Sequence, residues 1–203
     1  MTSTQIIAKE GYKGAIVLLV LFLVFLWLDW GLLIFLSFLC LLLWLFAFRN
    51  PERLPDDRFN PIVLAPIDGK IEKISAHADR LHICIAVDWL DVGIIRAPSD
   101  IVSYEVCKKS GLFLRYCQEE LKNALNTKIT FSSQAQHCFE MELFPEIFSS
   151  ATFYEKTHCT INDRMGFMKL GRLELRFPAK LLDIKVNIGD KIKGGQTLIG
   201  YIK

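Results

Sequence analysis

The feature that most restricts the fold of this chain is a long apolar run near its N-terminus. Between Ala15 and Phe48 the sequence holds 34 residues, of which only Asp29, Gly31 and Ser37 are not apolar. A run of this length and composition is typical of a membrane segment, and it is too long for the apolar part of a signal peptide. The sequence therefore predicts a membrane anchor in residues 1–48.

A single helix over this run would not fit a bilayer well. It would be about 51 Å long at 1.5 Å per residue, whereas the hydrocarbon core is about 30 Å thick. It would also bury Asp29 near the bilayer centre, at a cost of roughly 3 kcal/mol. We therefore expect a hairpin of two short helices, about 13–28 and 32–48, with Asp29 in a turn between Trp27 and Trp30. One long, tilted helix is the alternative.

Basic residues flank the apolar run on both sides. Lys9 and Lys13 precede it, while Arg49, Arg53 and Arg58 follow it. A hairpin places both groups on one side of the membrane, which the positive-inside rule makes the cytoplasmic side. We expect the protein in the cell (inner) membrane, with the rest of the chain facing the cytoplasm.

The charge and cysteine content of the chain exclude some classes of ligand and partner. The net charge is +2, from 24 Lys and Arg against 22 Asp and Glu, and no basic run with interleaved aromatics occurs, so nucleic acid is not expected. The six cysteines form no CxxC pair, which favours a reduced environment. His137–Cys138 and His158–Cys159 each offer one inward ligand at most on a strand, so no metal site is expected.

The remainder of the chain reads as a linker, 49–60, followed by one domain, 61–203. The expected fold class is mainly β (α+β), because short alternating or β-branched runs dominate. The expected strands are Cys138–Phe144, His82–Val87, Ile101–Val106, Leu198–Ile202 and a strand after Gly171 in which Leu173, Leu175 and Phe177 face one side. The clearest helix candidate is Gly111–Asn126.

Two glycine-rich segments hint at a topology. Ala65–Ile71 and Val186–Ile202 each place a turn between apolar strands, as in the barrel-sandwich (hybrid-motif) domains of biotinyl and lipoyl carriers. Two ordinary hairpins would give the same pattern. In a carrier domain Lys169 would be the modified lysine. Its simpler interpretation is a basic residue at a solvated strand end.

Several motifs, taken in their order along the chain, carry a family resemblance. They are Phe48–Arg53, Ala65–Lys70, Asp91–Pro98, Gly166–Gly171, Gly189–Ile192 and Gly194–Thr197. Together they resemble the phosphatidylserine decarboxylase family, particularly its short class, which includes archaetidylserine decarboxylase-like proteins. The likeness runs from the N-terminal apolar hairpin to the last strand, although residues 111–160 match poorly.

The resemblance implies a defined chemistry. Members of the family are made as proenzymes that cut themselves at a Gly-Ser bond, and the serine becomes a pyruvoyl group on the new chain. That ketone forms a Schiff base with the substrate and accepts electrons as CO₂ leaves, so no bound cofactor is needed. Asp68, in the turn Ala65–Lys70, matches an acid of the family; from the residues alone it is equally an Asx-type turn residue.

This sequence departs from the family pattern where that chemistry needs it most. The family has a serine between this glycine and an arginine, but here Arg172 follows Gly171 directly, so the serine is deleted and not substituted. No Ser, Thr or Cys lies between Asn162 and Gln196. Because arginine has no hydroxyl, the resemblance implies that no pyruvoyl group forms here.

A second departure lies in the segment Asp91–Pro98. Gly93 stands where the family has a histidine, and Ile95 stands where it has an asparagine. Asp68 is thus a retained acid without the partners it would activate.

The sequence therefore predicts a membrane-anchored, phosphatidylserine decarboxylase-related protein of phosphatidylethanolamine metabolism that has lost catalysis. Such a pseudoenzyme would bind an aminophospholipid head group or modulate an active decarboxylase paralogue. One alternative is an active decarboxylase with an unconventional nucleophile, Thr160 or Cys159. Another is a membrane-tethered barrel-sandwich carrier or adaptor, with a modified Lys169.

Overall fold

The computed structural model describes residues 6–53, 62–77, 80–112, 119–133, 139–146, 151–154 and 158–202. The chain divides into two compact units, Met1–Glu52 and Arg53–Lys203. Four expectations fall wholly or partly outside the described residues. They concern positions 54–60 of the expected linker, positions 113–118 of the expected helix, the pair His137–Cys138, and position 138 of the expected strand Cys138–Phe144.

The first unit consists of helices. A short 3-10 helix η1 (Lys9–Gly11) leads into α1 (Tyr12–Trp27), and α2 (Gly31–Ala47) follows after a tight turn. Asp29 lies in that turn with φ of 55°, a left-handed conformation that aspartate tolerates better than most residues. The chain therefore reverses at the most polar residue of the apolar run.

The two helices pack along each other. The rings of Phe22 and Phe38 lie 5.7 Å apart, and the indole N–H of Trp44 donates to the carbonyl of Gly11 at 2.9 Å. A Cβ on Gly14 would lie 2.1 Å from the Trp44 ring, so only glycine permits this approach. The segment Lys9–Trp27 is long and apolar enough to cross a membrane by length and composition alone, whereas α2 is shorter.

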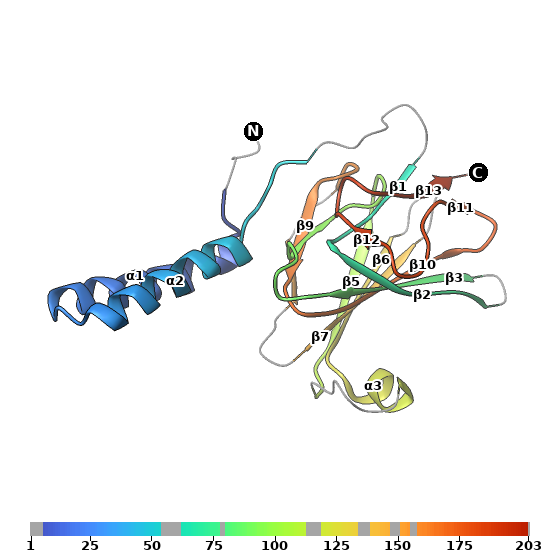
Figure 1. Ribbon diagram of the computed structural model, residues 1–203. Helices are drawn as coiled ribbons and strands as arrows, with labels where there is room; N and C mark the ends of the chain where they lie inside the picture. The colour runs from blue at the N-terminus through green and yellow to red at the C-terminus, as the bar shows by residue number, and fades with distance from the viewer. Residues whose placement is uncertain are drawn as a thin grey trace. The chain divides into compact units, whose positions relative to one another are not determined.

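Within the described residues, the second unit is an antiparallel β-structure with one short helix, shown in Figure 1. Its largest sheet has seven strands, which in spatial order are β12 (Lys191–Ile192), β2 (Gly69–His77), β3 (Arg80–Val87), β10 (Gly171–Pro178), β7 (Glu140–Pro145), β6 (Lys128–Ser133) and β5 (Tyr104–Lys109).

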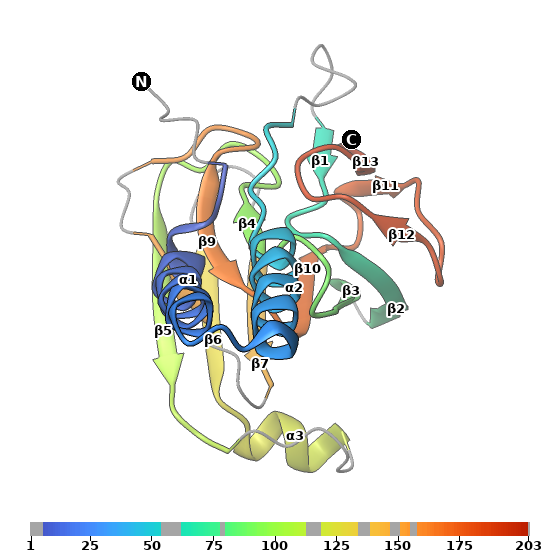
Figure 2. The same ribbon diagram turned by 60° about the vertical axis from the view of Figure 1, so that its left-hand side comes forward.

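Two smaller sheets complete this unit, and each has three strands. One has the order β1 (Ile62–Leu64), β13 (Leu198–Ile202), β11 (Leu182–Ile184); the other has the order β4 (Ile94–Arg96), β9 (Arg164–Met168), β8 (Ala151–Phe153). Helix α3 (Glu119–Leu125) lies between β5 and β6 in the chain and beyond the ends of those strands, as Figure 2 shows.

One face of the seven-stranded sheet forms the core. Leu173, Leu175 and Phe177 of β10 are at most 1% exposed, as their alternation predicts. They belong to the same buried cluster as Ile95 of β4 and Ile199 of β13. Both small sheets therefore pack their apolar side chains against this face.

The opposite face of the sheet carries paired charges. Glu142 of β7 is only 3% exposed, and its two carboxylate oxygens each accept a hydrogen bond from Arg176 at 2.7 Å. Lys128 forms a further ion pair with Glu142, and Arg172 pairs with Glu174 at 3.1 Å. The charged side chains on this face are therefore paired both along β10 and across to Glu142 of β7.

The expectation of a mainly β chain with an N-terminal apolar helix is confirmed. The barrel-sandwich arrangement stays a prediction.

Candidate active-site region

Gly171 and Arg172, where members of the family would cut themselves, form the regular start of strand β10. Gly171 opens β10 with φ of 145°, and a Cβ there would lie 2.3 Å from the Phe144 carbonyl oxygen, so the position requires glycine. Arg172 continues the strand and is paired with Ala86 of β3 and Phe144 of β7. Its guanidinium lies over the Phe144 ring at 5.2 Å and forms the ion pair with Glu174. Arg172 is thus held by both neighbouring strands.

Gly93 stands where the family has a histidine, and β9 packs directly against it. The carbonyl of Gly93 accepts a hydrogen bond from the amide of Met168 at 2.8 Å. A Cβ on Gly93 would lie 2.6 Å from the Met168 carbonyl oxygen and 3.0 Å from the Phe167 ring. Any side chain here would push against backbone. Ile95, two residues on, is fully buried in the core.

The carboxylate of Asp68 accepts hydrogen bonds from Arg53 and from the backbone of Gly194. It is 7% exposed, and Arg53 binds both of its carboxylate oxygens, with Nη2 donating to Oδ2 at 2.7 Å. The amide of Gly194 donates to Oδ1 at 2.8 Å, and Arg53 Nη1 also donates to the Gly194 carbonyl at 2.9 Å. The carboxylate therefore ties the start of the second unit to the loop after β12.

Asn162 extends this polar cluster. Its side-chain amide donates to the Arg53 carbonyl at 2.6 Å, and its Oδ1 accepts from Arg96 at 3.2 Å. Asn162 adopts φ of 70°, which asparagine tolerates and which brings its side chain over the backbone of Gly195. The sequence indicated Arg53 through its charge and through the motif Phe48–Arg53, but nothing in the sequence singled out Asn162. Its only signal was its residue type, an asparagine in the turn before β9.

The family positions lie near one another in the fold. Gly171 pairs with Val87, the last residue of β3, and Arg172 shares a row with Ala86 and Lys70. The amide of Arg96, at the end of β4, donates to the carbonyl of Pro66 in the turn that carries Asp68, at 2.7 Å. The turn of Asp68 is thus joined to the end of β4, and Gly171 to the end of β3. Of the side chains at positions 68, 93, 95 and 171, only the Asp68 carboxylate can accept a proton, and none has a hydroxyl or a thiol.

Lys169 is buried, and this corrects both earlier interpretations of it. Its exposed fraction is 3%, its ammonium donates to the carbonyl of Asp91 at 2.5 Å, and it lies 5.9 Å from the Trp89 ring centroid. A carrier lysine needs an exposed tip, and a solvated strand end would also be exposed. The alternation of the flanking residues gave no hint of this, because Lys169 lies just beyond the end of β9.

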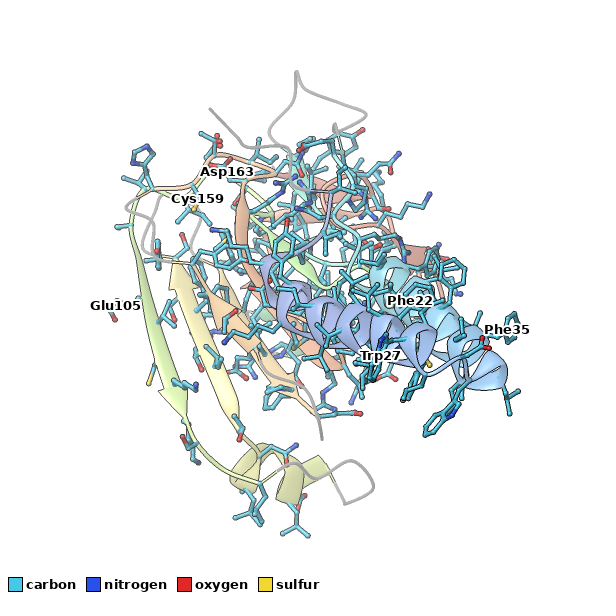
Figure 3. The ribbon with its side chains drawn as sticks, turned by 90° about the vertical axis from the view of Figure 1, so that its left-hand side faces the viewer. Phe22, Trp27, Phe35, Glu105, Cys159 and Asp163 are labelled. Atoms are coloured by element: carbon cyan, nitrogen blue, oxygen red, sulfur yellow. The ribbon has the colours of Figure 1, made fainter. Side chains whose placement is uncertain are left out.

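The alternative nucleophiles lie before β9. Cys159 is 3% exposed, and its amide and carbonyl are both paired with Ile101, at 3.0 and 2.8 Å. Thr160 is exposed, and its amide donates to Asp163 at 3.1 Å. Figure 3 shows Cys159 and Asp163 close together. The five residues of β9 separate this turn from the segment at Gly171, which corresponds to roughly 16 Å of extended chain.

The residues present do not fit a pyruvoyl group, because the residue after Gly171 carries a guanidinium and no hydroxyl. No group of three or more His, Cys, Asp or Glu side chains suited to a metal ion occurs within the described part of the chain.

Comparison with known proteins identifies the class. Residues 41–200 match the model of the phosphatidylserine decarboxylase family. The chain is 27% identical over 173 residues to a phosphatidylserine decarboxylase proenzyme of Amoebophilus asiaticus, covering 79% of this chain and 76% of the relative. It is 26% identical over 210 residues to the proenzyme of Geotalea uraniireducens, covering 97% and 96%. No solved structure matches this chain.

The matched region includes every motif from Ala65 to Thr197 that the sequence analysis singled out. The chain belongs to the phosphatidylserine decarboxylase family.

Proposed function

We propose that this protein is a membrane-anchored member of the family in phospholipid (phosphatidylethanolamine) metabolism that neither cuts itself nor decarboxylates. The observation that carries the proposal is Arg172. It directly follows Gly171 and is an integral residue of β10, paired on both sides. Self-cleavage requires a hydroxyl at this position to attack the preceding carbonyl, and arginine supplies none.

The surroundings support the same conclusion. A general base needs to reach the proton it removes. Gly93 has no side chain to act as one, and the space beside it is taken by Phe167 and Met168. Asp68 has both oxygens bound by Arg53 and the Gly194 amide. The site has become a packed and ion-paired part of the scaffold.

The N-terminal helices are the proposed anchor. Their large apolar side chains are mostly exposed, which a bilayer would cover. A hairpin across the membrane puts Lys9 and Lys13 on the same side as Arg49, and the positive-inside rule makes that side cytoplasmic. The second unit would then work at the inner membrane, facing the cytoplasm.

Two roles remain for a scaffold that has lost its chemistry. It binds an aminophospholipid head group, or it associates with an active decarboxylase and modulates it. Family membership favours the first role, because a decarboxylase scaffold is shaped for that substrate. A lipid-dependent rise in melting temperature supports the first role, and co-purification with a decarboxylase supports the second. Absence of both results contradicts this part of the proposal.

The intact mass of the protein, purified in detergent from its native host, tests the central claim. A single species near 23.3 kDa is expected. Two fragments whose masses together account for the whole chain would show self-cleavage, and their masses would locate the nucleophile at Thr160, Cys159 or elsewhere. Extra mass on Lys169 would instead support the carrier alternative.

A further inference from the structure

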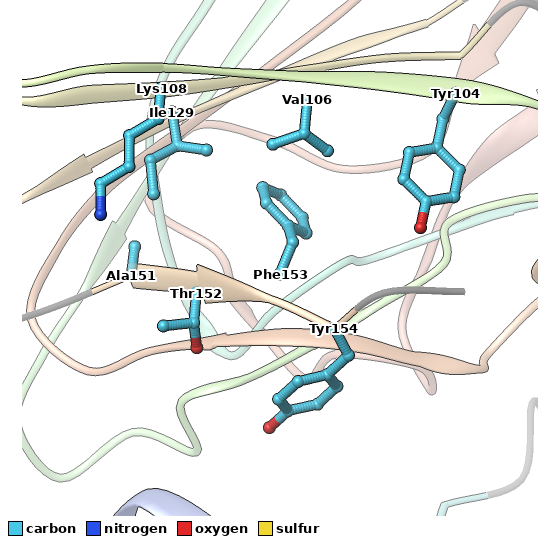
Figure 4. Close-up of a pocket in the computed structure, with 8 residues that line it drawn as sticks. All are labelled: Tyr104, Val106, Lys108, Ile129, Ala151, Thr152, Phe153 and Tyr154. Atoms are coloured by element: carbon cyan, nitrogen blue, oxygen red, sulfur yellow. The ribbon is translucent and has the colours of Figure 1, made fainter. Parts of the chain in front are cut away.

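A groove lies between two strands that end their sheets. Within the described part of the chain, β5 is the last strand of the seven-stranded sheet, and β8 is the last strand of the sheet that holds β4 and β9. Side chains of both strands line a groove of about 420 Å³, here called the β5–β8 groove and drawn in Figure 4. Small-molecule sites measure about 300–1,000 Å³, so this volume suits one small ligand.

The lining of the β5–β8 groove is mainly apolar. Ile129 and Ala151 are at most 5% exposed and belong to the core. Phe153 packs against the same core, with its ring 5.3 Å from that of Phe131. Val106 of β5 also lines the groove but is 44% exposed. Buried residues thus form the base of the groove, while its mouth leaves apolar surface that a ligand can cover.

Lys108 is a cation on a face of the sheet where its neighbours are apolar. It pairs with Ile129 of β6. The same row continues through Leu143 of β7 to Leu173 of β10, and these three apolar residues are at most 4% exposed. Within the described residues, the Lys108 ammonium has no hydrogen bond and no ion pair. The groove therefore combines an apolar lining with one cation that no described carboxylate neutralises.

The cation lies at one end of the groove. Figure 4 shows Lys108 at one end and Tyr104 at the other, with Val106 and Phe153 between them. Lys108 and Tyr104 are four residues apart on β5, which corresponds to about 13 Å of strand. A ligand that fits this arrangement has one negatively charged end and one extended apolar chain.

We propose that the β5–β8 groove binds a fatty acid, with its carboxylate on the Lys108 ammonium and its chain along Val106 and Phe153. The carboxylate supplies an anion to Lys108 through a charge-assisted hydrogen bond, and the chain covers the apolar lining. One cation at the end of a short groove favours a single-chain acid over a phospholipid with two chains. The inference does not depend on the proposed loss of catalysis; the proposed membrane anchor only keeps the groove near a source of such acids.

Photolabelling of the full chain in phosphatidylcholine nanodiscs tests this binding. The probe is dodecanoic acid with a diazirine in its chain, used at mildly alkaline pH so that its carboxylate is charged. We expect peptides from β5 and β8 to carry the label. Excess dodecanoate should remove it, whereas dodecyltrimethylammonium, with the same chain and the opposite charge, should not. Label on α1 and α2, the proposed anchor, is non-specific and should resist both competitors.

Two pairs of variants on β5 separate the role of the charge from that of the apolar lining. Lys108→Gln should raise the probe concentration for half-maximal labelling of the groove about tenfold, because it removes the charged donor. Lys109→Gln is its control, because Lys109 lies on the opposite face and donates to the carbonyl of Ala124 at 3.0 Å. Val106→Trp fills the groove and should prevent labelling, while Cys107→Trp adds the same bulk on the opposite face and should not.

Four results would overturn the proposal. Label confined to α1 and α2 would show that the groove takes no acyl chain. Equal competition by dodecyltrimethylammonium would show that the charge plays no part. A diazirine-bearing phosphatidylserine that labels β5 and β8 as strongly as the probe would show that the groove contacts bilayer lipid instead. Unchanged labelling of Lys108→Gln, with more aggregation, would make Lys108 an inward charge that only protects the sheet edge.

Discussion

Arg53 and Asp68 form a two-pronged ion pair, with Nη2 donating to Oδ2 at 2.7 Å, and their side chains are only 11% and 10% exposed. The Gly194 amide donates to the same carboxylate. The acid that the family resemblance marks as functional is therefore the centre of a junction. It joins the start of the second unit, the turn before β2 and the loop after β12.

We expect Asp68→Ala to lower the free energy of unfolding by about 3–5 kcal/mol, because it leaves the Arg53 guanidinium nearly buried without its counterion. Chemical denaturation of the full chain in detergent measures this loss. Arg53→Met should cost a similar amount, and the double variant less than the sum of the two. Asp183→Ala, which breaks the exposed ion pair with Lys185, is the control and should have a far smaller effect. Equal losses for Asp68→Ala and Asp183→Ala would contradict the junction.

Arg172→Ser puts a hydroxyl directly after Gly171 without changing the length of β10. We expect the variant to remain one chain near 23.3 kDa, because Gly93 supplies no base and Asp68 is held by Arg53. The intact mass of the variant, measured beside that of the unaltered chain, tests this expectation. Two fragments from this variant would mean that only the serine is missing and that the surrounding site is still competent.

Gly93→His should not restore a catalytic histidine but destabilise the fold. Its Cβ would meet the Met168 carbonyl oxygen at 2.6 Å, so β4 and β9 would have to separate, at a cost of about 1–3 kcal/mol. Gly93→Ala isolates the effect of the Cβ and should show part of this loss. Gly31→Ala, at a position with nothing within 4 Å, is the control. A Gly93→His variant with the same melting temperature as the unaltered chain would contradict this packing.

Strands with clean alternation were predictable from the sequence. Leu198–Ile202 is a strand with the expected bounds, and the expected strand His82–Val87 lies within β3. The expected strand Ile101–Val106 was displaced: β5 begins at Tyr104, while Ile101 forms only an isolated bridge with Cys159. Local pattern fixes which residues are extended, but long-range pairing decides where a ladder begins.

The candidate site was less predictable, because its side chains come from distant segments. The motif around Asp68 was visible, yet nothing local shows that Arg53 and Gly194 bind its carboxylate. Similarly, alternation places Glu142 on a polar face, where exposure is the ordinary expectation. Its burial follows from two cations on neighbouring strands, Arg176 and Lys128.

Glu142 and Glu140 allow a matched comparison on one strand. Glu142→Gln removes the charge that both Arg176 and Lys128 share, and we expect a loss of about 3 kcal/mol in the free energy of unfolding. Glu140 is 33% exposed at its side chain and pairs with Arg80 at 3.1 Å, so Glu140→Gln should cost less than about 1 kcal/mol. Denaturation of both variants under the same conditions measures the difference. Equal effects would show that burial of the Glu142 pair does not matter.

Lys169 provides a test that separates the carrier interpretation from a packed scaffold. Its ammonium is nearly inaccessible and donates to the Asp91 carbonyl at 2.5 Å, whereas Lys193 is exposed. We expect an amine-acetylating reagent to modify Lys193 rapidly and Lys169 only on unfolding, as read by peptide mass spectrometry. Lys169→Met should also lower the free energy of unfolding by about 1–3 kcal/mol, because the half-buried Asp91 loses the donor to its carbonyl. Rapid labelling of Lys169 in the folded protein would place it at the surface, where a carrier group could be attached, and would contradict its role in packing.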